Sequence, residues 1–560
     1  MEYPWLDNYP EGVPAKINPD IFPSLQAMFA HTVHHNPHHI AVTNFGVSLT
    51  YQQLDKQASS LAAYWQSLGL VKGDRLAVML PNVIQYYVVL FAAFKLGLVV
   101  VNVNPLYTAY ELQHQIKDAQ AKAIIVLENF AKTLQDALAE TSLEHLFITR
   151  FADAFPWWKR TLGNFMVKYV AKMVPSYSLP GAHGYCQAIK QGQSLPLLLA
   201  ELKGDDLAFL QYTGGTTGVP KGAMLSHRNM VANVEQAYAW MQPMVNYGKE
   251  IMITALPLYH IFSLLANCLV FIRAGSQSVL VTNPRDMKQF IKTLKKHRFT
   301  AITGVNTLFN GLLNQPKFSE IDFSHLKFAL GGGMALQRSV AERWEQATDS
   351  TLCEAYGLTE TSPAVTINPL DLPGYNGSIG LPIPSTEVKV VDDNHNTLPL
   401  GERGELCIKG PQVMQGYWQR PEETEQVLID GWFKTGDIAQ IDDQGFVYLV
   451  DRKKDMVDVS GFNVYPNEVE DIIARHPQVM EVAVIGVAHE KTGEALKAFV
   501  VPKEANLDKE DIRRFCRDYL TKYKVPKFYE FCATLPKNNV GKILRRELRE
   551  GGCPEKEVSS

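Results

Sequence analysis

Residues 74–128 read DRLAVMLPNVIQYYVVLFAAFKLGLVVVNVNPLYTAYELQHQIKDAQAKAIIVLE, and they alternate between two patterns. The runs DRLAVML, LVVVNVN and AKAIIVLE are rich in consecutive aliphatic residues, which is typical of strands buried on both faces. The segments between them, 82–97 and 108–120, have the apolar spacing of helices. Strands that alternate with helices indicate a parallel sheet covered by helices. The stretch therefore predicts an α/β fold.

The alternation continues on both sides of this stretch. Residues 40–45 are strand-like, residues 48–70 follow a Ser/Thr cap with helical spacing, and the pattern resumes from 250 to 380. After about residue 380 the chain changes to short strands and turns, which predicts a small β unit. The remaining C-terminal part combines helical and strand-like segments and predicts a compact α+β unit.

The composition is that of a multidomain globular protein. A chain of 560 residues is too long for one hydrophobic core, and 46% hydrophobic with 20% charged residues are ordinary values. The net charge of −4 gives no general attraction to nucleic acid, so no nucleic-acid partner is expected. The seven cysteines are scattered without a CxxC pair, which predicts reduced thiols.

No segment predicts a signal peptide or a membrane span. The first residues, MEYPWLDNYPEGVP, lack a basic region followed by an apolar one. The most apolar stretch is interrupted by Lys95 and Gly97, and the apolar run at 261–275 is too short to cross a bilayer. We therefore expect a cytoplasmic protein.

Residues 211–222, QYTGGTTGVPKG, have the composition of a phosphate-binding loop. Glycines let the backbone turn and present amides, threonine hydroxyls can donate to phosphate oxygens, and Lys221 adds positive charge. The Walker A sequence GxxxxGK[ST] is absent here, and Lys542 of a second Gly-Lys pair is followed by Ile543. A P-loop kinase is therefore disfavoured, and a flexible surface loop is the alternative for this segment alone.

Residues 154–175, AFPWWKRTLGNFMVKYVAKMVP, form a basic segment that interrupts the α/β alternation. A basic amphipathic helix can lie on an anionic bilayer surface, and the alternative is a helix packed on its own domain. The segment contains no acidic residue and four basic ones, Lys159, Arg160, Lys168 and Lys172.

Six segments, of which the loop is the first, follow one another along the chain: TGGTTGVPKG at 213–222, GGG at 331–333, AYGLTETSP at 355–363, WFKTGDIAQIDDQGFVYLVDRKKD at 432–455, SGFNVYPNEVE at 460–470 and PKNNVGKILRREL at 536–548. Together they resemble the ordered signatures of the adenylate-forming superfamily, which includes acyl-CoA synthetases, luciferases and peptide-synthetase adenylation domains. The resemblance covers nearly the whole chain. One departure is Ala355, where relatives often have glycine, and a methyl group there is tolerable.

The resemblance implies a two-step ligase reaction. ATP and a carboxylate first give an acyl-adenylate and pyrophosphate, and the thiol of coenzyme A then displaces AMP. ATP, Mg²⁺ and coenzyme A are the cofactors and co-substrates that this reaction implies. By the same resemblance the nucleotide-binding residues are Tyr212, Thr213, Gly214, Gly215, Thr216, Thr217, Gly218, Lys221, Gly331, Gly332, Gly333, Ala355, Tyr356, Gly357, Leu358, Thr359, Asp437, Arg452 and Gly461.

The resemblance also implies the catalytic residues. Lys542 is expected to reach the charge that develops between the carboxylate and the α-phosphate, since lysine is a compact charge on a flexible stem. Glu360 and Thr216 are the expected magnesium ligands, because Mg²⁺ prefers hard oxygen donors. His260 is a candidate for the mouth of the acyl site, and a buried structural histidine is the alternative there.

The family separates its half-reactions by rotating a small C-terminal domain, and the hinge corresponds to Lys454. The predicted domains are therefore 1–453, which binds ATP and the acyl chain, and 454–560, which is mobile and carries Lys542. Rotation would withdraw Lys542 and bring SGFNVYP toward the path of coenzyme A.

Three features favour a long-chain fatty acid as the acid that is activated. Residues 430–454 resemble the fatty-acyl-CoA synthetase signature, and the segments 256–271 and 301–313 are apolar, as an acyl tunnel requires. Segments such as NPLYTAYELQHQ and ITGVNTLFN are similar to those of bacterial long-chain fatty-acyl-CoA synthetases. The resemblance therefore implies a ligase of lipid metabolism that makes fatty acyl-CoA.

Other functions stay open at the level of the sequence. A ligase that loads a carrier protein or acts on aryl acids is the nearer alternative, and a fatty-acid-binding protein without turnover is a more distant one. A lipid-soluble substrate also favours peripheral attachment to the inner membrane through the basic segment. A homodimer is possible, although no symmetry cue is visible.

Overall fold

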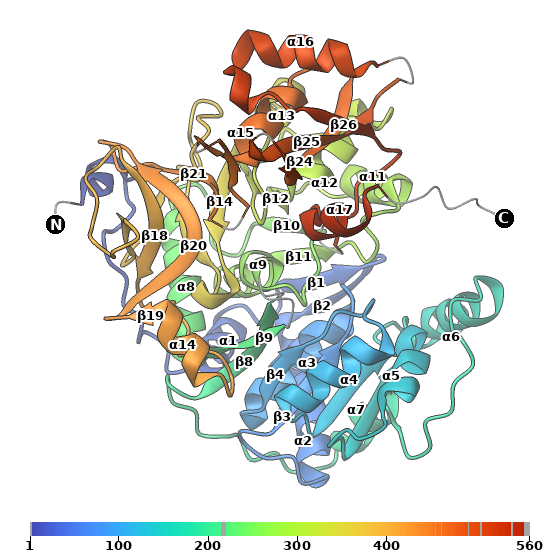
Figure 1. The fold of residues 1–560 in the computed structure, drawn as a ribbon. Coiled ribbons are helices and arrows are strands. Elements are labelled where there is room, and N and C mark those ends of the chain that lie inside the picture. Colours follow the sequence, from blue (N-terminus) through green and yellow to red (C-terminus); the bar gives the residue numbers. More distant parts are fainter. Residues whose placement is uncertain are drawn as a thin grey trace.

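The computed structural model describes residues 3–213, 220–453, 455–460, 462–490, 492–504, 507–538 and 541–553. These residues form four β-sheets with helices packed around and between them (Figure 1). The prediction of a large α/β part with a small β unit and a C-terminal α+β unit is confirmed.

The stretch 74–128 supplies the centre of a seven-stranded sheet. Its order is β7-β6-β5-β3-β4-β8-β9, and it is parallel except for the β8–β9 pair. The strands are β3 (Arg75–Met79), β4 (Val99–Asn102), β5 (Ala123–Leu127), β6 (His145–Thr149), β7 (His183–Gly184), β8 (Leu207–Thr213) and β9 (Lys221–Ser226), and the accompanying helices include α2 (Tyr51–Ser67), α4 (Ala109–Ala119), α5 (Ala131–Ala137) and α7 (Tyr185–Gly192).

A nine-stranded sheet comes mainly from residues 250–382. Its order is β16-β15-β14-β13-β12-β10-β11-β1-β2, with a parallel centre and antiparallel strands at both ends. The strands are β1 (Ile40–Asn44), β2 (Val47–Thr50), β10 (Ile251–Thr254), β11 (Gln277–Leu280), β12 (Ala301–Gly304), β13 (Phe328–Gly331), β14 (Leu352–Gly357), β15 (Ala364–Ile367) and β16 (Leu381–Pro382), and the helices are α1 (Leu25–His35), α8 (His227–Met241), α9 (Ile261–Ser263), α10 (Val270–Arg273), α11 (Met287–Lys296), α12 (Asn306–Leu313) and α13 (Arg338–Thr348).

Helix α3 (Ile84–Leu96) joins these two sheets. It contacts β3 and β4 of the seven-stranded sheet and β1 of the nine-stranded sheet, and each of its residues is buried. A helix that is apolar on all sides is expected only in the core of a large protein. Lys95 pairs with Asp55, Gln85 donates to the carbonyl of Arg150, and the Tyr86 hydroxyl donates to the carbonyl of Leu258. Gly97 in the left-handed conformation ends the helix.

The last two sheets are smaller. The β unit contains β17 (Glu387–Val391), β18 (Arg403–Lys409), β19 (Leu428–Ile429), β20 (Trp432–Ile441) and β21 (Val447–Arg452) with α14 (Pro421–Val427), and it is antiparallel. The C-terminal unit follows β21 and lies against the edge of the molecule where the β unit meets the nine-stranded sheet (Figure 1). It consists of β22 (Val457–Val459), β23 (Phe462–Val464), β24 (Val479–His489), β25 (Gly493–Pro502) and β26 (Phe528–Phe531) with α15 (Pro466–Ala474), α16 (Lys509–Tyr519) and α17 (Arg545–Gly551). The division at 453/454 stays a prediction.

One expectation about the cysteines was wrong. Cys532, next to the end of β26, and Cys553, just after α17, form a disulfide, whereas the other five cysteines are free. The two residues are 21 positions apart, and only the folding of the C-terminal unit brings them together, so the spacing gave no signal.

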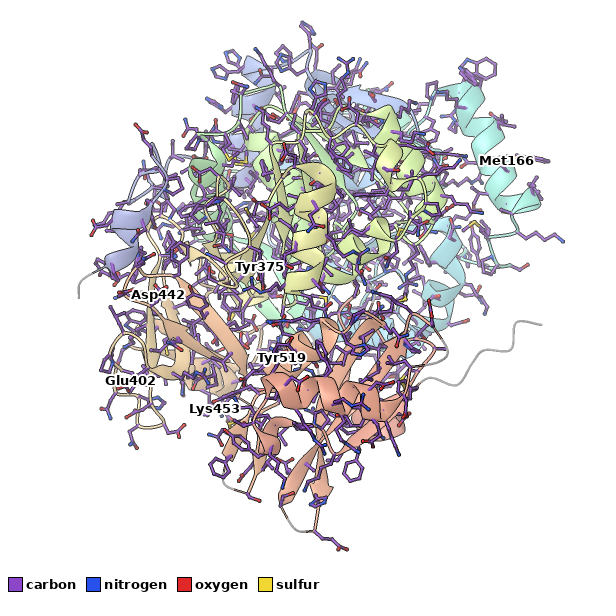
Figure 2. The ribbon with its side chains drawn as sticks, turned by 90° about the horizontal axis from the view of Figure 1, so that it is seen from above. Met166, Tyr375, Glu402, Asp442, Lys453 and Tyr519 are labelled. Carbon is purple, nitrogen blue, oxygen red and sulfur yellow. A yellow bond between two sulfur atoms is a disulfide. The ribbon has the colours of Figure 1, made fainter. Side chains whose placement is uncertain are left out.

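The basic segment forms α6 (Trp157–Phe165) and a π-helical turn (Met166–Val170), and neither has a buried residue. It projects from the body of the molecule, and Met166 lies at the outer edge (Figure 2). Across the described ranges, no helix combines the length and the apolar character that a bilayer crossing requires.

Gly380 precedes β16 of the nine-stranded sheet, and its carbonyl accepts a hydrogen bond from the N–H of Val447 in the β unit. We expect its replacement by alanine to be strongly destabilising. Its φ is +96°, and a Cβ would lie 2.1 Å from the backbone carbon of Ile367. We expect Gly380→Ala to cost about 3 kcal/mol and to lower the thermal midpoint by about 3 °C in scanning fluorimetry. Gly184→Ala is the matched control, since no atom lies within 4 Å of its Cβ position. Equal midpoints for both variants would contradict the assignment.

Candidate active site

The predicted site residues meet in one cavity of about 1880 Å³. It lies where β14, the β20–β21 hairpin, the start of β9 and the C-terminal unit come together. Every described residue of the predicted site lines it except Gly331, which is buried in β13 beside Gly304. The lining members are Tyr212, Thr213, Lys221, His260, Gly332, Gly333, Ala355, Tyr356, Gly357, Leu358, Thr359, Glu360, Asp437, Arg452 and Lys542.

Seven predicted positions lie outside the described residues, so the geometry does not bear on them. They are Gly214, Gly215, Thr216, Thr217 and Gly218 of the phosphate loop, the hinge position Lys454, and Gly461.

Tyr356, Asp437 and Arg452 form a contact between two sheets. Asp437 and Arg452 stand opposite each other in the antiparallel β20–β21 pair, so their side chains share one face. The Tyr356 hydroxyl donates to Asp437 Oδ2 at 2.5 Å, and Arg452 Nε is 3.5 Å from Oδ1. Burial raises the pKa of Asp437, although Arg452 and the tyrosine hydroxyl oppose the rise. Asp437 is therefore a buried carboxylate in the cavity wall, and each of its two oxygens has a partner.

Glu360 lies in a short 3₁₀ turn, Thr359–Thr361, directly after β14. Its Oε1 accepts the Tyr417 hydroxyl at 2.7 Å, and burial raises the pKa of the carboxyl group. The ammonium of Lys221 is 5.3 Å from the centre of the Tyr417 ring. Tyr417 therefore links the acid and the lysine that the sequence selected. Sequence reasoning missed it, because only the return of the chain beside β9 brings residue 417 here.

Tyr212 is held by contacts near the end of β8. Its hydroxyl donates to Asp118 Oδ2 of α4 at 2.6 Å, and Arg420 holds the other oxygen of that carboxylate at 3.0 Å. The ring lies against Gly222, where a Cβ would be 3.2 Å away. The end of β8 is therefore fixed immediately before the loop begins.

Lys542 enters the cavity on a turn of the C-terminal unit. The backbone N–H and the carbonyl of Lys542 both bond to Asn538, at 2.8 Å each. The carbonyl of Gly541 accepts from the Thr307 hydroxyl at 3.2 Å, which attaches the turn to α12 of the large part. The structure therefore places Lys542 against the site of the large part.

His260 is partly buried in the cavity wall. Desolvation and the nearby Lys542 lower its pKa to about 4, which favours the neutral ring. Its Nδ1 accepts a hydrogen bond from the Phe262 amide and caps α9, so the ring has a structural partner as well as a place in the cavity wall. A structural role and a place in the cavity wall, the two alternatives that the sequence offered for His260, are therefore compatible.

Beyond His260 the cavity continues as an apolar arm between α8, the α9–α10 region and the nine-stranded sheet. Among the described residues from 237 to 330, no Asp, Glu, Lys or Arg lines the cavity. Phe328, Leu330 and Gly332 line it from one face of β13 and the residue after it, as the two-residue period of a strand requires. Gly332 lies beside Phe262, whose ring would be 3.1 Å from a Cβ there. The other apolar lining residues include Ala237, Trp240, Met241, Met252, Leu265, Ala266, Val270 and Phe271.

Comparisons with known proteins agree over nearly the whole chain. The model of the AMP-binding enzyme family matches residues 29–418, and that of the AMP-binding enzyme C-terminal domain matches residues 468–542. A long-chain-fatty-acid–CoA ligase of Escherichia coli O6:H1 is 53% identical over 551 residues, and one of Bacillus subtilis is 40% identical over 555 residues. In both cases the alignment covers 98% of this chain and 98% of the relative.

Solved structures agree as well. The anthranilate CoA ligase AuaEII, in complex with anthranoyl-AMP, has the same fold, with a TM-score of 0.85, 23% identity, and coverage of 96% of this chain and 99% of that one. ATP-bound MatB from Rhodopseudomonas palustris gives a TM-score of 0.79 at 29% identity, with coverage of 94% and 98%. These matches confirm the resemblance to adenylate-forming enzymes, and the chain belongs to the AMP-binding enzyme family.

Proposed function

We propose that this protein is an AMP-forming ligase that activates long-chain fatty acids. It converts fatty acid and ATP into an acyl-adenylate with release of pyrophosphate, and it then transfers the acyl group to coenzyme A with release of AMP. The observation that carries the proposal is the uncharged apolar arm that opens beside the nucleotide side of the cavity. A fatty acid has no handle except its chain, and each buried methylene contributes about 0.8 kcal/mol. The long-chain-fatty-acid–CoA ligases at 53% and 40% identity favour this function over a carrier-protein or aryl-acid ligase.

On the nucleotide side we assign roles by chemistry. Asp437 and Arg452 contact the ribose region, since a carboxylate can accept from both hydroxyls, and Tyr356 offers a flat ring to adenine. Lys221 and Thr213 lie at the two ends of the phosphate loop and contact the phosphates that leave as pyrophosphate. Glu354 shares this cavity as an uncharged acid near neutrality, because burial raises its pKa to about 8.

Magnesium suits this site, because Glu360 is a buried carboxylate facing the cavity beside Lys221 and hard oxygen donors suit that ion. Glu360 would hold it together with Thr216, and the ion would supply neutralisation of phosphate charge. The chain's own contribution is orientation: Tyr417 fixes Oε1 of Glu360, so the second carboxylate oxygen has a defined direction.

Lys542 serves the first half-reaction. Its ammonium stabilises the negative charge that develops between the substrate carboxylate and the α-phosphate, which is a charge-stabilising role rather than a covalent one. The neutral His260 beside it adds no competing positive charge. For the second half-reaction, residues 454–560 rotate, which withdraws Lys542 and lets coenzyme A approach the same acyl carbon.

Removing the Lys542 ammonium should separate the two half-reactions. Fatty acids of graded length should stimulate ATP–pyrophosphate exchange in the native protein. We expect Lys542→Ala to slow that exchange at least about a hundredfold, while thioester formation from a supplied acyl-adenylate stays close to normal. Lys522→Ala, at an exposed lysine of the same unit, is the control. If no fatty acid stimulates exchange, the adenylation proposal fails.

Filling the apolar arm at Leu330 should shorten the preferred substrate. Leu330 lies between Phe328 and Gly332 on the lining face, so a tryptophan there would obstruct the arm partway down. We expect Leu330→Trp to lower the ratio of kcat/KM for hexadecanoic acid to that for octanoic acid by about tenfold or more. Leu330→Met, which nearly conserves volume, should keep the ratio. An unchanged ratio in the tryptophan variant would rule out this course for the chain.

We further propose that the basic segment attaches the protein to the inner membrane surface. Its aromatic and aliphatic side chains face solvent; Trp157 is 74% and Tyr169 62% exposed. Lys159 lies beside this apolar surface, 5.3 Å from the centre of the Trp158 ring, whereas Arg160 turns toward its own domain and donates to Cys186 Sγ. Basic and apolar side chains are combined in this way in helices that lie in the interface of an anionic bilayer. Lys168 also pairs with Glu128 at 3.0 Å, which connects the segment to its own domain. A second copy of the chain is the other possible occupant of this surface, which would make a homodimer.

Vesicle sedimentation tests the attachment. Replacing Lys159, Arg160, Lys168 and Lys172 by glutamine should lower binding to anionic vesicles by about tenfold or more, because each basic residue near such a surface contributes about 1 kcal/mol. The matched control is the same change at the exposed lysines of α11, Lys288, Lys292, Lys295 and Lys296. Binding that is insensitive to the first variant would exclude the segment as the anchor. Self-association without vesicles that the variant abolishes would favour the dimer.

A further inference from the structure

A cluster of five charged side chains lies where β21 meets the C-terminal unit, and the reaction as described does not use it. Arg545 Nη1 is 3.3 Å from Asp451 and 3.5 Å from Asp455, and its Nη2 is 2.8 Å from Glu470. Arg549 is 2.7 Å from the other oxygen of Asp455. The side chain of Asp451 is 1% exposed and that of Arg545 16%, so the cluster is largely withdrawn from water.

Asp451 makes the contacts that cross from β21 to the C-terminal unit. Its Oδ1 accepts from the backbone N–H of Arg452 at 2.7 Å and faces Arg545. Its Oδ2 accepts from the N–H of Asn467 in the first turn of α15 at 2.9 Å, where a negative charge also complements the helix dipole. The other two carboxylates that contact Arg545 are Asp455, 9% exposed, and Glu470, 16% exposed; both follow residue 454, and Glu470 lies on α15, so these contacts stay within the C-terminal unit.

Arg545 also fixes the turn that carries Lys542. Leu544 donates its N–H to the carbonyl of Pro536 at 2.9 Å, and Lys537 pairs with Ile543, so the base of this turn is closed. Arg545 follows that base directly. The position of the Lys542 ammonium is thereby connected to Asp451, the immediate neighbour of Arg452, whose guanidinium faces Asp437.

We propose that Asp451 and Arg545 form a positioning pair that holds Lys542 against the nucleotide for adenylate formation. The inference rests on the proposed function, in which Lys542 serves the first half-reaction only and the chain pivots at residue 454. The pivot lies between Asp451 and Arg545 but not between Glu470 and Arg545. Rotation therefore separates Asp451 from Arg545 and preserves the Glu470–Arg545 contact. The Asp451–Arg545 contact then exists only in the arrangement that forms the adenylate.

Asp451→Asn tests the pair, because asparagine keeps the shape of the side chain and one acceptor oxygen but loses the charge that faces Arg545 and the second acceptor for a backbone amide. We expect ATP–pyrophosphate exchange to fall about tenfold or more, with thioester formation from a supplied acyl-adenylate within about twofold of normal. Glu470→Gln, the control, should alter both half-reactions to the same extent. Arg545→Lys, which keeps the charge, should recover part of the exchange that Arg545→Gln loses.

The outcomes are distinguishable from failure of the proposed function. If Lys542→Ala separates the half-reactions but Asp451→Asn slows both equally, the positioning role is wrong and the cluster only stabilises the fold. If Asp451→Asn does not fold, Arg545→Lys and Arg545→Gln decide, and parallel losses in both half-reactions overturn the inference. If Lys542→Ala itself does not separate the half-reactions, the proposed function fails first and this inference with it.

Discussion

The buried carboxylate of Asp437 is the contact on which the arrangement of the site depends. It accepts the Tyr356 hydroxyl from the nine-stranded sheet and faces Arg452 across the β20–β21 pair of the β unit. A buried charge is tolerated only when it is paired and hydrogen-bonded, so these two units cannot shift relative to each other without exposing an unsatisfied carboxylate. Asp451, which directly precedes Arg452, extends the same connection to the C-terminal unit through Arg545. The nine-stranded sheet, the β unit and the C-terminal unit are thus held together at one edge of the cavity.

The cavity separates two kinds of chemistry along its length. Charged side chains line the cavity where the β unit and the C-terminal unit meet it, whereas no Asp, Glu, Lys or Arg among the described residues from 237 to 330 lines it. A substrate carboxylate with an apolar tail is oriented by this division alone, since its charged end is stabilised only at one end of the cavity. Neutral His260 lies at the boundary and adds no charge to either side.

Local patterns predicted the elements well, because strands buried on both faces and capped helices leave clear signals. The stretch 74–128 forms the expected strands and helices, and the change after residue 380 marks the β unit. The site residues could be predicted because each lies in a short contiguous motif, and all the described ones except Gly331 line one cavity. What the sequence did not reveal depends on contacts between distant segments: Tyr417 beside Glu360, Asp118 beneath Tyr212, the Asp451–Arg545 pair and the Cys532–Cys553 bond. None has a periodicity, because each pairing is decided by how whole units dock. The roles of the individual site residues stay predictions.

Helix α3 has a consequence for how the large part of the molecule can exist at all. Because its sides are covered by helices α1 and α2 as well as by strands of both sheets, neither sheet alone can enclose it. A fragment ending between the sheets would leave a thirteen-residue, strongly apolar helix in water. Although their strand orders are separate, the two sheets constitute a single folding unit because they share this helix. During synthesis, the elements that contact α3 most, α1, α2, β1, β3 and β4, are complete by residue 102, whereas the Tyr86 hydroxyl of α3 finds one of its acceptors, the carbonyl of Leu258, only 172 residues further along the chain.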